Sequence, residues 1–170
     1  MNPSDSITLM SAAHVQRTMQ RIAHEIYENN KKNYPIKLLG INERGLVLAQ
    51  MLRAMLSKLC DVRVTADQLK VDKESTNKDA LFVEKQETAP FTVIVDDVIF
   101  SGQTMFKALQ AVVGALNPDE IYTVALIDRG HRKIPVQAIF CGLELPTKLD
   151  EHVSVIAEDK EVEEVVLTYQ

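Results

Sequence analysis

The chain has 170 residues, of which 46% are hydrophobic and 5% aromatic, and its formal net charge is −5. This length predicts a single domain over residues 1–170, and the net negative charge excludes nucleic-acid binding by the molecule as a whole, because an acidic surface repels phosphate. Cys60 and Cys141 are too few and too far apart for a disulfide framework or a zinc site, and no apolar stretch is long enough to span a bilayer. We therefore expect a soluble, cytoplasmic α/β protein without a membrane partner.

The first predicted helix covers residues 12–29, with Ser11 as its N-cap. Its apolar residues fall on one stripe, and potentially cationic side chains recur at three- and four-residue steps on another face: His14, Arg17, Arg21 and His24. A solvated helix face explains this spacing, and a surface that binds an anionic partner is the alternative.

Residues 36–41 predict the first core strand, and a helix follows from Asn42 to about Leu59. The connection Asn42-Glu43-Arg44-Gly45 therefore lies where a strand meets a helix, a common ligand site in α/β sheets. Arg44 is the candidate anion ligand, because a guanidinium can bind two phosphate oxygens in one plane. A surface cation at a helix start is the alternative.

A third strand is predicted at residues 62–65. The following sequence, from Ala66 to Pro90, is polar and weakly patterned, with a candidate short strand at residues 80–83. A connection of this length within one domain is typically a lid or a disordered segment.

The stretch from Phe91 to Thr104 carries the clearest chemistry. Residues 91–95 predict a strand buried on both faces, and Asp96 and Asp97 follow at its carboxyl end. Ser101-Gly102-Gln103-Thr104 then opens a helix whose apolar residues recur at helical spacing: Phe106, Leu109, Val113 and Leu116. Free backbone amides at the helix start, together with two hydroxyls, predict a phosphate site, and the paired acids suit sugar hydroxyls or a metal ion.

An NTPase and a plain turn both fit this stretch less well. A Walker B strand also ends in acids, but an NTPase requires a Gly-rich loop with Lys-Ser/Thr, which the upstream sequence lacks. A plain strand-to-helix turn accounts for the apolar residues but not for paired acids beside a phosphate-type loop.

The last third of the chain predicts two more strands and a small subdomain. Residues 121–127 predict a strand that ends in Asp128-Arg-Gly-His-Arg132, and residues 138–141 predict a short one. About residues 142–170 are expected to form a cap over the sheet ends, with the acidic tract 158–164 as a solvated connection.

Two acids after a hydrophobic strand, followed by an aromatic residue and Ser-Gly-x-Thr, resemble the phosphoribosyl pyrophosphate (PRPP) signature of the type I phosphoribosyltransferases. The resemblance implies a parallel sheet flanked by helices, with a small C-terminal hood. It also implies that about residues 66–90 are a flexible lid that closes over the reacting sugar and excludes water. The candidate lid residue is Lys73, in Val71-Asp-Lys-Glu74.

Three further segments resemble one group in that family, the bacterial pyrimidine operon attenuation proteins, which are also uracil phosphoribosyltransferases. The segments are Arg21-Ile-Ala-His-Glu-Ile26, Gly40-Ile-x-x-Arg-Gly45 and Ala125-Leu-Ile-Asp-Arg-Gly-His-Arg-Lys-Ile-Pro135. The likeness covers nearly the whole chain. It implies a transferase that makes UMP and pyrophosphate from uracil and PRPP, and a UMP-responsive regulator that binds the mRNA leader of pyrimidine genes. The alternatives are an RNA-binding regulator or nucleotide sensor with little or no catalysis, and a paralogue that binds nucleotides for an unrelated assembly.

The resemblance assigns roles to individual residues. The 5′-phosphate site would be Ser101, Gly102, Gln103 and Thr104, and the pyrophosphate site Asn42, Glu43, Arg44 and Gly45. Asp96 and Asp97 would hold the ribose hydroxyls, directly or through Mg²⁺, and would form the catalytic set with Arg44. The base would lie by Phe100, Asp128 and Arg129, and Phe100 favours a pyrimidine because purine-salvage relatives tend to carry an acid there. Candidate RNA contacts are Arg17, Arg21, His24, His131 and Arg132. A homodimer or higher homo-oligomer is expected.

Overall fold

The computed structural model describes residues 6–71, 89–158 and 161–169. Its helices are α1 (Ala12–Asn29), α2 (Asn42–Leu59) and α3 (Gln103–Leu116). Its strands are β1 (Ile7–Ser11), β2 (Ile36–Ile41), β3 (Val64–Leu69), β4 (Phe91–Ile99), β5 (Glu120–Asp128), β6 (Phe140–Glu144), β7 (Glu151–Glu158) and β8 (Glu161–Tyr169). Among these helices, none is both long enough and apolar enough to cross a membrane.

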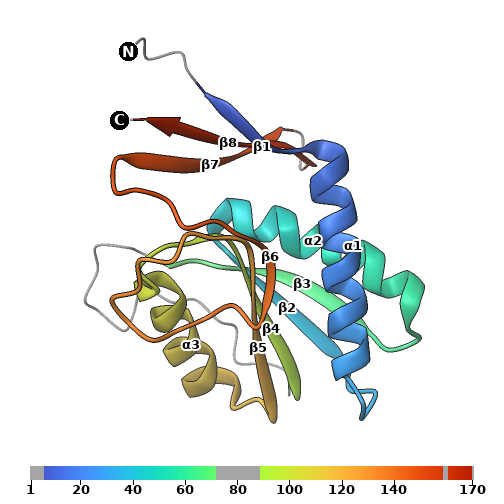
Figure 1. Ribbon diagram of the computed structural model, residues 1–170. Helices are drawn as coiled ribbons and strands as arrows, with labels where there is room; N and C mark the ends of the chain where they lie inside the picture. Colours follow the sequence, from blue (N-terminus) through green and yellow to red (C-terminus); the bar gives the residue numbers. More distant parts are fainter. Residues whose placement is uncertain (1–5, 72–88, 159–160, 170) are drawn as a thin grey trace.

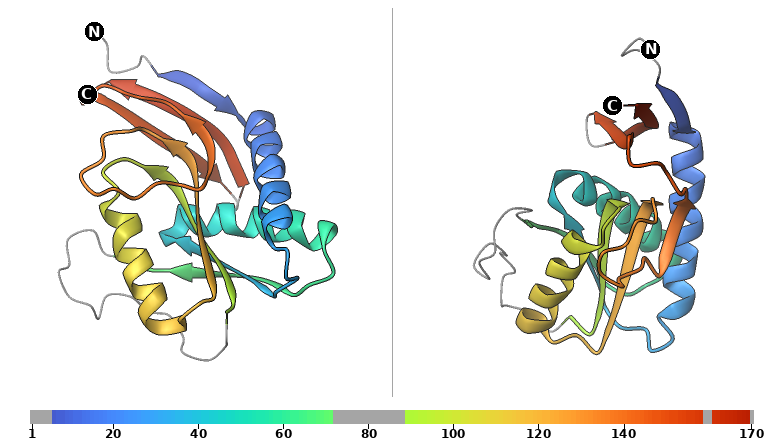
Figure 2. Two further views of the ribbon diagram at one scale, coloured as in Figure 1. Left: turned by 60° about the horizontal axis from the view of Figure 1, so that its bottom comes forward. Right: turned by 60° about the vertical axis from the view of Figure 1, so that its left-hand side comes forward.

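A parallel sheet in the order β3-β2-β4-β5-β6 forms the centre of the molecule, with α1 and α2 on one side and α3 on the other (Figure 1; Figure 2). Neighbouring residues of a strand face opposite layers. Leu38 and Val93 therefore join the core beneath α1 and α2, whereas Leu39 and Ile94 join the core beneath α3. Burial on both faces explains why these strands are unbroken apolar runs.

The hood is an antiparallel sheet built from both ends of the chain. Its strand order is β1-β8-β7, and it lies next to α2 and the first turns of α1 (Figure 1). Val153 and Val165 from the hood pack in the same core as α1 and α2. The sequence predicted the hood at about residues 142–170 and missed β1, because Ile7–Ser11 is too short to be recognised without its partner strand.

Three predicted boundaries were wrong. Strand β4 continues past Val95 to Ile99, so both aspartates belong to the strand. Strand β3 runs through Leu69, into the segment that was predicted to start the lid at Ala66. The described part of the acidic tract 158–164 belongs to strands, since Glu158 ends β7 and residues 161–164 begin β8. The candidate strand 80–83 and Lys73 lie outside the described residues.

The helix predicted after the Ser101–Thr104 loop is α3, and only part of its apolar side chains are buried. The helix packs on the sheet through Met105, Ala108 and Val112, while Phe106 and Val113 are exposed. Leu109 and Leu116 pack against the edge of this core. Of the four apolar positions at helical spacing, two thus pack on the core and two face solvent.

Candidate active site

Two adjoining cavities lie at the carboxyl ends of the parallel strands. One has a volume of about 560 Å³ and is lined by the start of α2, the end of β3 and the acids of β4. The other, of about 490 Å³, is lined by residues 99–104 and the first turns of α3. Asp96, Val98 and Thr104 line both cavities, so the two form one cleft. The carboxyl ends of strands are where α/β proteins bind ligands.

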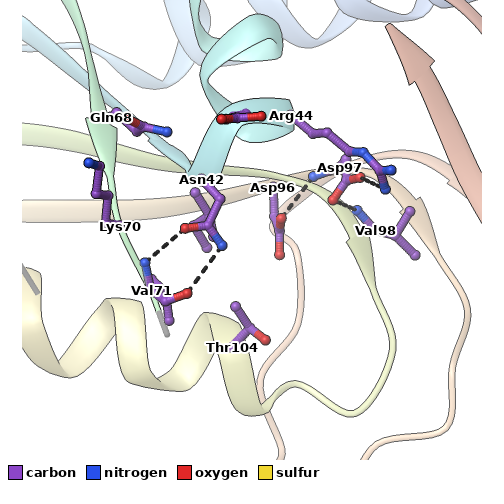
Figure 3. Close-up of a pocket in the computed structure, with 11 residues that line it drawn as sticks. Asn42, Arg44, Gln68, Lys70, Val71, Asp96, Asp97, Val98 and Thr104 are labelled. Atoms are coloured by element: carbon purple, nitrogen blue, oxygen red, sulfur yellow. Dashed lines mark hydrogen bonds and ion pairs between the residues drawn. The ribbon is translucent and has the colours of Figure 1, made fainter. Parts of the chain in front are cut away.

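The paired acids occupy the middle of this cleft. Asp96 is 6% exposed and its Oδ1 accepts a hydrogen bond from the amide of Asp97 at 3.0 Å. Oδ1 of Asp97 accepts in turn from the amide of Val98 at 2.9 Å. Figure 3 shows the Asp96 carboxylate pointing toward the start of α3, where Thr104 lies, whereas Asp97 lies beside Arg44. The backbone thus fixes the direction of both carboxylates.

The phosphate loop, Ser101–Thr104, is held open by its surroundings. Gly102 has a φ of +82°, and a Cβ there would lie 2.9 Å from the carbonyl oxygen of Ile134, so only glycine fits. The carbonyl of Ser101 accepts from the amides of Lys133 and Ile134. Within the described residues, the first amide of this turn that donates to a backbone carbonyl is that of Phe106. The Gln103 amide makes a long hydrogen bond of 3.4 Å to Oγ of Ser101, so the amides between it and Phe106 are the ones that can serve an anion at the α3 start.

The predicted pyrophosphate loop forms the first turn of α2. Gly40 and Gly45 allow this turn to lie directly on the sheet, because a Cβ on Gly40 would be 2.3 Å from the amide nitrogen of Leu46 and one on Gly45 would be 2.5 Å from the carbonyl of Val95. Gly45 is therefore a packing residue. Glu43 and Arg44 are exposed beside the cavity, and Nη1 of Arg44 lies 3.6 Å from Oδ2 of Asp97. A cation at a helix start is unfavourable without a nearby anion.

Asp128 and Arg132 organise the loop after β5. The carboxylate of Asp128 accepts from the amide of Gly130 at 2.9 Å and forms an ion pair with Arg132. The same guanidinium donates to the carbonyls of Phe100 and Gly130, both at 2.8 Å, and of Val136 at 2.7 Å. Asp128 was predicted to contact the base and Arg132 to contact RNA. In the structure their charged groups are bonded to each other and to this loop, and the two roles stay predictions.

Arg129 connects Phe100 to the hood. Its guanidinium lies over the Phe100 ring, 4.4 Å from the centroid, and donates to Oγ1 of Thr147 and the carbonyl of Glu151. Burial lowers the pKa of Arg129, and the carboxylate of Glu151 opposes that shift. The ring of His131 lies 5.1 Å from that of Phe100 and bonds to the carbonyl of Thr147. Phe100, predicted to contact the base, is thus held by two side chains anchored to one threonine.

The predicted RNA contacts do not form one uniform surface. His14, Arg17 and His24 are exposed on α1. Arg21 is on the same helix, but its guanidinium pairs with Glu25 at 2.6 Å and donates to the carbonyls of Cys141 and Gly142 on β6. This bonding ties α1 to the edge of the sheet.

Two lining residues were missed by the sequence prediction. Gln68 and Lys70 come from the end of β3 and lie across the cavity from Arg44 and Asp97 (Figure 3). The sequence feature that could have identified them is the alternation in residues 68–71, where polar Gln68 and Lys70 alternate with apolar Leu69 and Val71. These two apolar residues are 0% and 5% exposed, as expected of a strand with one buried face.

The donor set of the cleft suits Mg²⁺ carried by a phosphate ligand. Within the described residues, no group of three or more His, Cys, Asp or Glu side chains forms a metal cage. The neighbouring carboxylates of Asp96 and Asp97 line the cavity together. Mg²⁺ commonly takes one or two protein carboxylates and completes its octahedron with water and ligand phosphates, which fits this pair.

Comparison with known proteins identifies the family. Residues 11–159 match the phosphoribosyl transferase domain. The chain belongs to this family. It is 37% identical over 153 residues to the bifunctional protein PyrR of Macrococcus caseolyticus, covering 85% of this chain and 88% of that protein. It is 34% identical over 168 residues to the bifunctional protein PyrR of Staphylococcus aureus, covering 94% and 96%. The chain is therefore also a member of the PyrR family, which confirms the resemblance seen in the sequence.

Solved structures confirm the fold. The hypoxanthine phosphoribosyltransferase of Trypanosoma cruzi superposes with a TM-score of 0.76 at 16% identity, covering 95% of each chain. A hypoxanthine-guanine phosphoribosyltransferase from Bacillus anthracis superposes with a TM-score of 0.72 at 19% identity, over the full length of both chains. At these identities the likeness concerns the fold alone, and it confirms the predicted type I phosphoribosyltransferase architecture.

Proposed function

We propose that the protein transfers the phosphoribosyl group of PRPP to uracil, giving UMP and pyrophosphate. The observation that supports this function is the convergence of three groups on one cleft: the acids of β4, the amides at the α3 start and the cations beside α2. These are the groups that a sugar bearing a phosphate at one end and a pyrophosphate at the other requires.

Each part of PRPP has a complementary part of the cleft. The 5′-phosphate binds the amides and hydroxyls of Ser101–Thr104, and the ribose hydroxyls bind Asp96 and Asp97. The pyrophosphate lies between Arg44 and Lys70, which line the first cavity from opposite sides. Mg²⁺, held by the two aspartates and by oxygens of the substrate, would neutralise charge on the departing pyrophosphate.

The reaction exchanges one bond at C1′ of the ribose for another. The bond from C1′ to the pyrophosphate oxygen breaks, N1 of uracil forms the new bond to C1′, and the N1 proton is released. No protein nucleophile is needed, because catalysis consists of holding the reactants in line and stabilising the leaving group. Arg44 serves the second purpose, and Phe100, fixed by Arg129 and His131, provides the surface against which the base lies.

Product formation from labelled uracil tests this proposal. Incubation with PRPP and Mg²⁺ is expected to give UMP, and Asp97→Ala, which removes one of the two acids, is expected to abolish most of the product. Hypoxanthine in place of uracil is expected to give little product. A yield of UMP no higher than that of Asp97→Ala would overturn the proposal, and a preference for hypoxanthine would overturn the choice of base.

We also propose UMP-dependent binding of a pyrimidine-gene mRNA leader as a second function. The exposed His14, Arg17 and His24 support it, because hydrogen-bond donors spaced along one helix face suit a phosphate backbone. Loss of one phosphate contact in Arg17→Ala should lower the slope of binding against salt by roughly one. Affinity for leader RNA that changes neither with UMP nor in Arg17→Ala would overturn this function.

A further inference from the structure

Asn42 stands at the point where β2 becomes α2. The parallel pairing of β2 with β3 ends at Ile41 and Leu69, and Asn42 is the next residue of the chain. Its φ of +54° lies in the left-handed region, which asparagine tolerates better than most residues. The chain leaves the sheet here, so its backbone can no longer pair with the residues that follow β3.

The side-chain amide of Asn42 makes the two hydrogen bonds that a backbone peptide group would make if the strand pairing continued. Its Nδ2 donates to the carbonyl of Val71 at 3.2 Å, and its Oδ1 accepts from the amide of Val71 at 3.0 Å. Both bonds are drawn in Figure 3. A side-chain amide carries the same donor and acceptor as a peptide group, so this pair extends the pairing of β2 with β3 beyond their last backbone contact. Val71 is 5% exposed and Asn42 is half-buried, so the pair lies partly buried at the wall of the cavity.

This pair of hydrogen bonds fixes one wall of the first cavity relative to another. Gln68 of β3 and the two residues just after that strand, Lys70 and Val71, line it on one side, and Arg44 lines it from α2. The lining of the cavity contains more acidic than basic side chains. The acids are Glu43, Asp96 and Asp97, and the bases are Arg44 and Lys70. A pyrophosphate group therefore depends on both cations being held at the correct separation.

We infer that Asn42 is a positioning residue for the pyrophosphate end of PRPP. The sequence assigned it to the pyrophosphate site itself, but both of its amide atoms are bonded to Val71. It acts by holding Lys70 opposite Arg44, and it thereby sets the affinity of the cavity for a doubly phosphorylated group. This inference rests on the proposed function, because Asn42 positions a side chain of the proposed pyrophosphate site.

The decisive variant is Asn42→Gly, because glycine accepts the positive φ and removes only the two side-chain bonds. Asn33→Gly is the matched control: Asn33 has a φ of +51°, is exposed, and lies between α1 and β2, away from the cleft. We expect Asn42→Gly to raise the dissociation constants for PRPP and for pyrophosphate with Mg²⁺ roughly tenfold or more, as for other groups that orient a ligand-binding residue. The KM for uracil should change by less than about twofold. Asn33→Gly should change none of these constants.

Two further measurements separate positioning from a general structural role. Lys70→Ala should weaken pyrophosphate binding in the wild type but have little further effect in Asn42→Gly, because the two changes act through one group. By NMR hydrogen exchange, the Val71 amide should be protected in the wild type and exposed in Asn42→Gly.

The outcomes distinguish this inference from the proposed function. If the wild type binds PRPP and Asn42→Gly binds it equally well, the inference is overturned and the proposed function stands. A Val71 amide that exchanges in the wild type as fast as in an unfolded peptide also overturns the inference. If the wild type binds neither PRPP nor pyrophosphate with Mg²⁺, the proposed function fails, and this inference fails with it.

Discussion

Arg132 and Asp128 form an ion pair four residues apart that closes the loop beside Phe100. Both side chains are less than a fifth exposed, and the guanidinium also donates to three backbone carbonyls in fixed directions, which few other side chains can do. One of these carbonyls belongs to Phe100, so the ion pair sets the position of the proposed base-binding ring.

Arg132→Lys is therefore expected to act on both stability and base binding. A lysine keeps the charge but cannot make the planar set of bonds, so the free energy of unfolding should fall by about 1–3 kcal/mol in urea denaturation. The KM for uracil should rise more than the KM for PRPP. Arg17→Lys, on the exposed face of α1, is the control and should alter neither. If Arg132→Lys and Asp128→Asn prove additive, the two residues do not act as a pair.

Substitution of Arg44 tests the pyrophosphate end of the cleft. Arg44→Lys retains a charge at the α2 start but loses bidentate binding, so kcat/KM for PRPP should fall by roughly tenfold, and Arg44→Ala should cost more. Arg53→Lys, an exposed position on the same helix, should leave the rate unchanged. Equal rates for Arg44→Ala and the wild type would show that the leaving group does not use this guanidinium.

Strong local signals made most of the site predictable from the sequence. Asp96 and Asp97 come directly after the apolar run of a buried strand, the Ser101–Thr104 loop precedes a helix, and each of these features is encoded within a dozen neighbouring residues. The approximate bounds predicted for α1 and α2 agree with the structure, because Ser11 caps one helix and the motif ending in Gly45 opens the other.

The features that the sequence did not predict depend on tertiary contacts. Arg132 looks like a surface cation in sequence, since nothing near it reveals that the carbonyls of Phe100 and Val136 converge on it. Lys70 enters the cavity only because β3 extends past Thr65, and β1 is defined only by its pairing with β8. Residues that act through distant backbone groups leave no periodic pattern to read.

Gly45→Ala is expected to destabilise the junction between α2 and the sheet. The new Cβ would lie 2.5 Å from the carbonyl oxygen of Val95, so α2 must shift, at a cost of about 1–3 kcal/mol in the free energy of unfolding. Gly114→Ala in α3 is the matched control, because a Cβ there meets nothing within 4 Å. That change should stabilise the protein by about 0.5–1 kcal/mol through helix propensity. Thermal unfolding that moves in the same direction for both variants would contradict this packing argument.

Cys141 is expected to react slowly despite being a free thiol. Burial raises its pKa to about 11, and the nearby carboxylates of Asp128 and Glu144 add to the shift. In a Cys60→Ser background, alkylation by iodoacetamide at pH 8 should be roughly 100-fold slower than for an ordinary cysteine, because only the thiolate reacts. The rate should rise about tenfold per pH unit up to about pH 10 and become ordinary in denaturing urea. A native-state rate that levels off near pH 9 would contradict the raised pKa.

The same shift predicts the sign of a stability change at alkaline pH. Between the ordinary thiol pKa and about 11, the unfolded chain has lost the Cys141 proton while the native chain retains it. The native state then binds more protons than the unfolded state, so the free energy of unfolding falls as pH rises through this window. Cys141→Ser in the same background should remove this part of the pH dependence. Identical alkaline slopes for the two proteins would show that this thiol does not contribute.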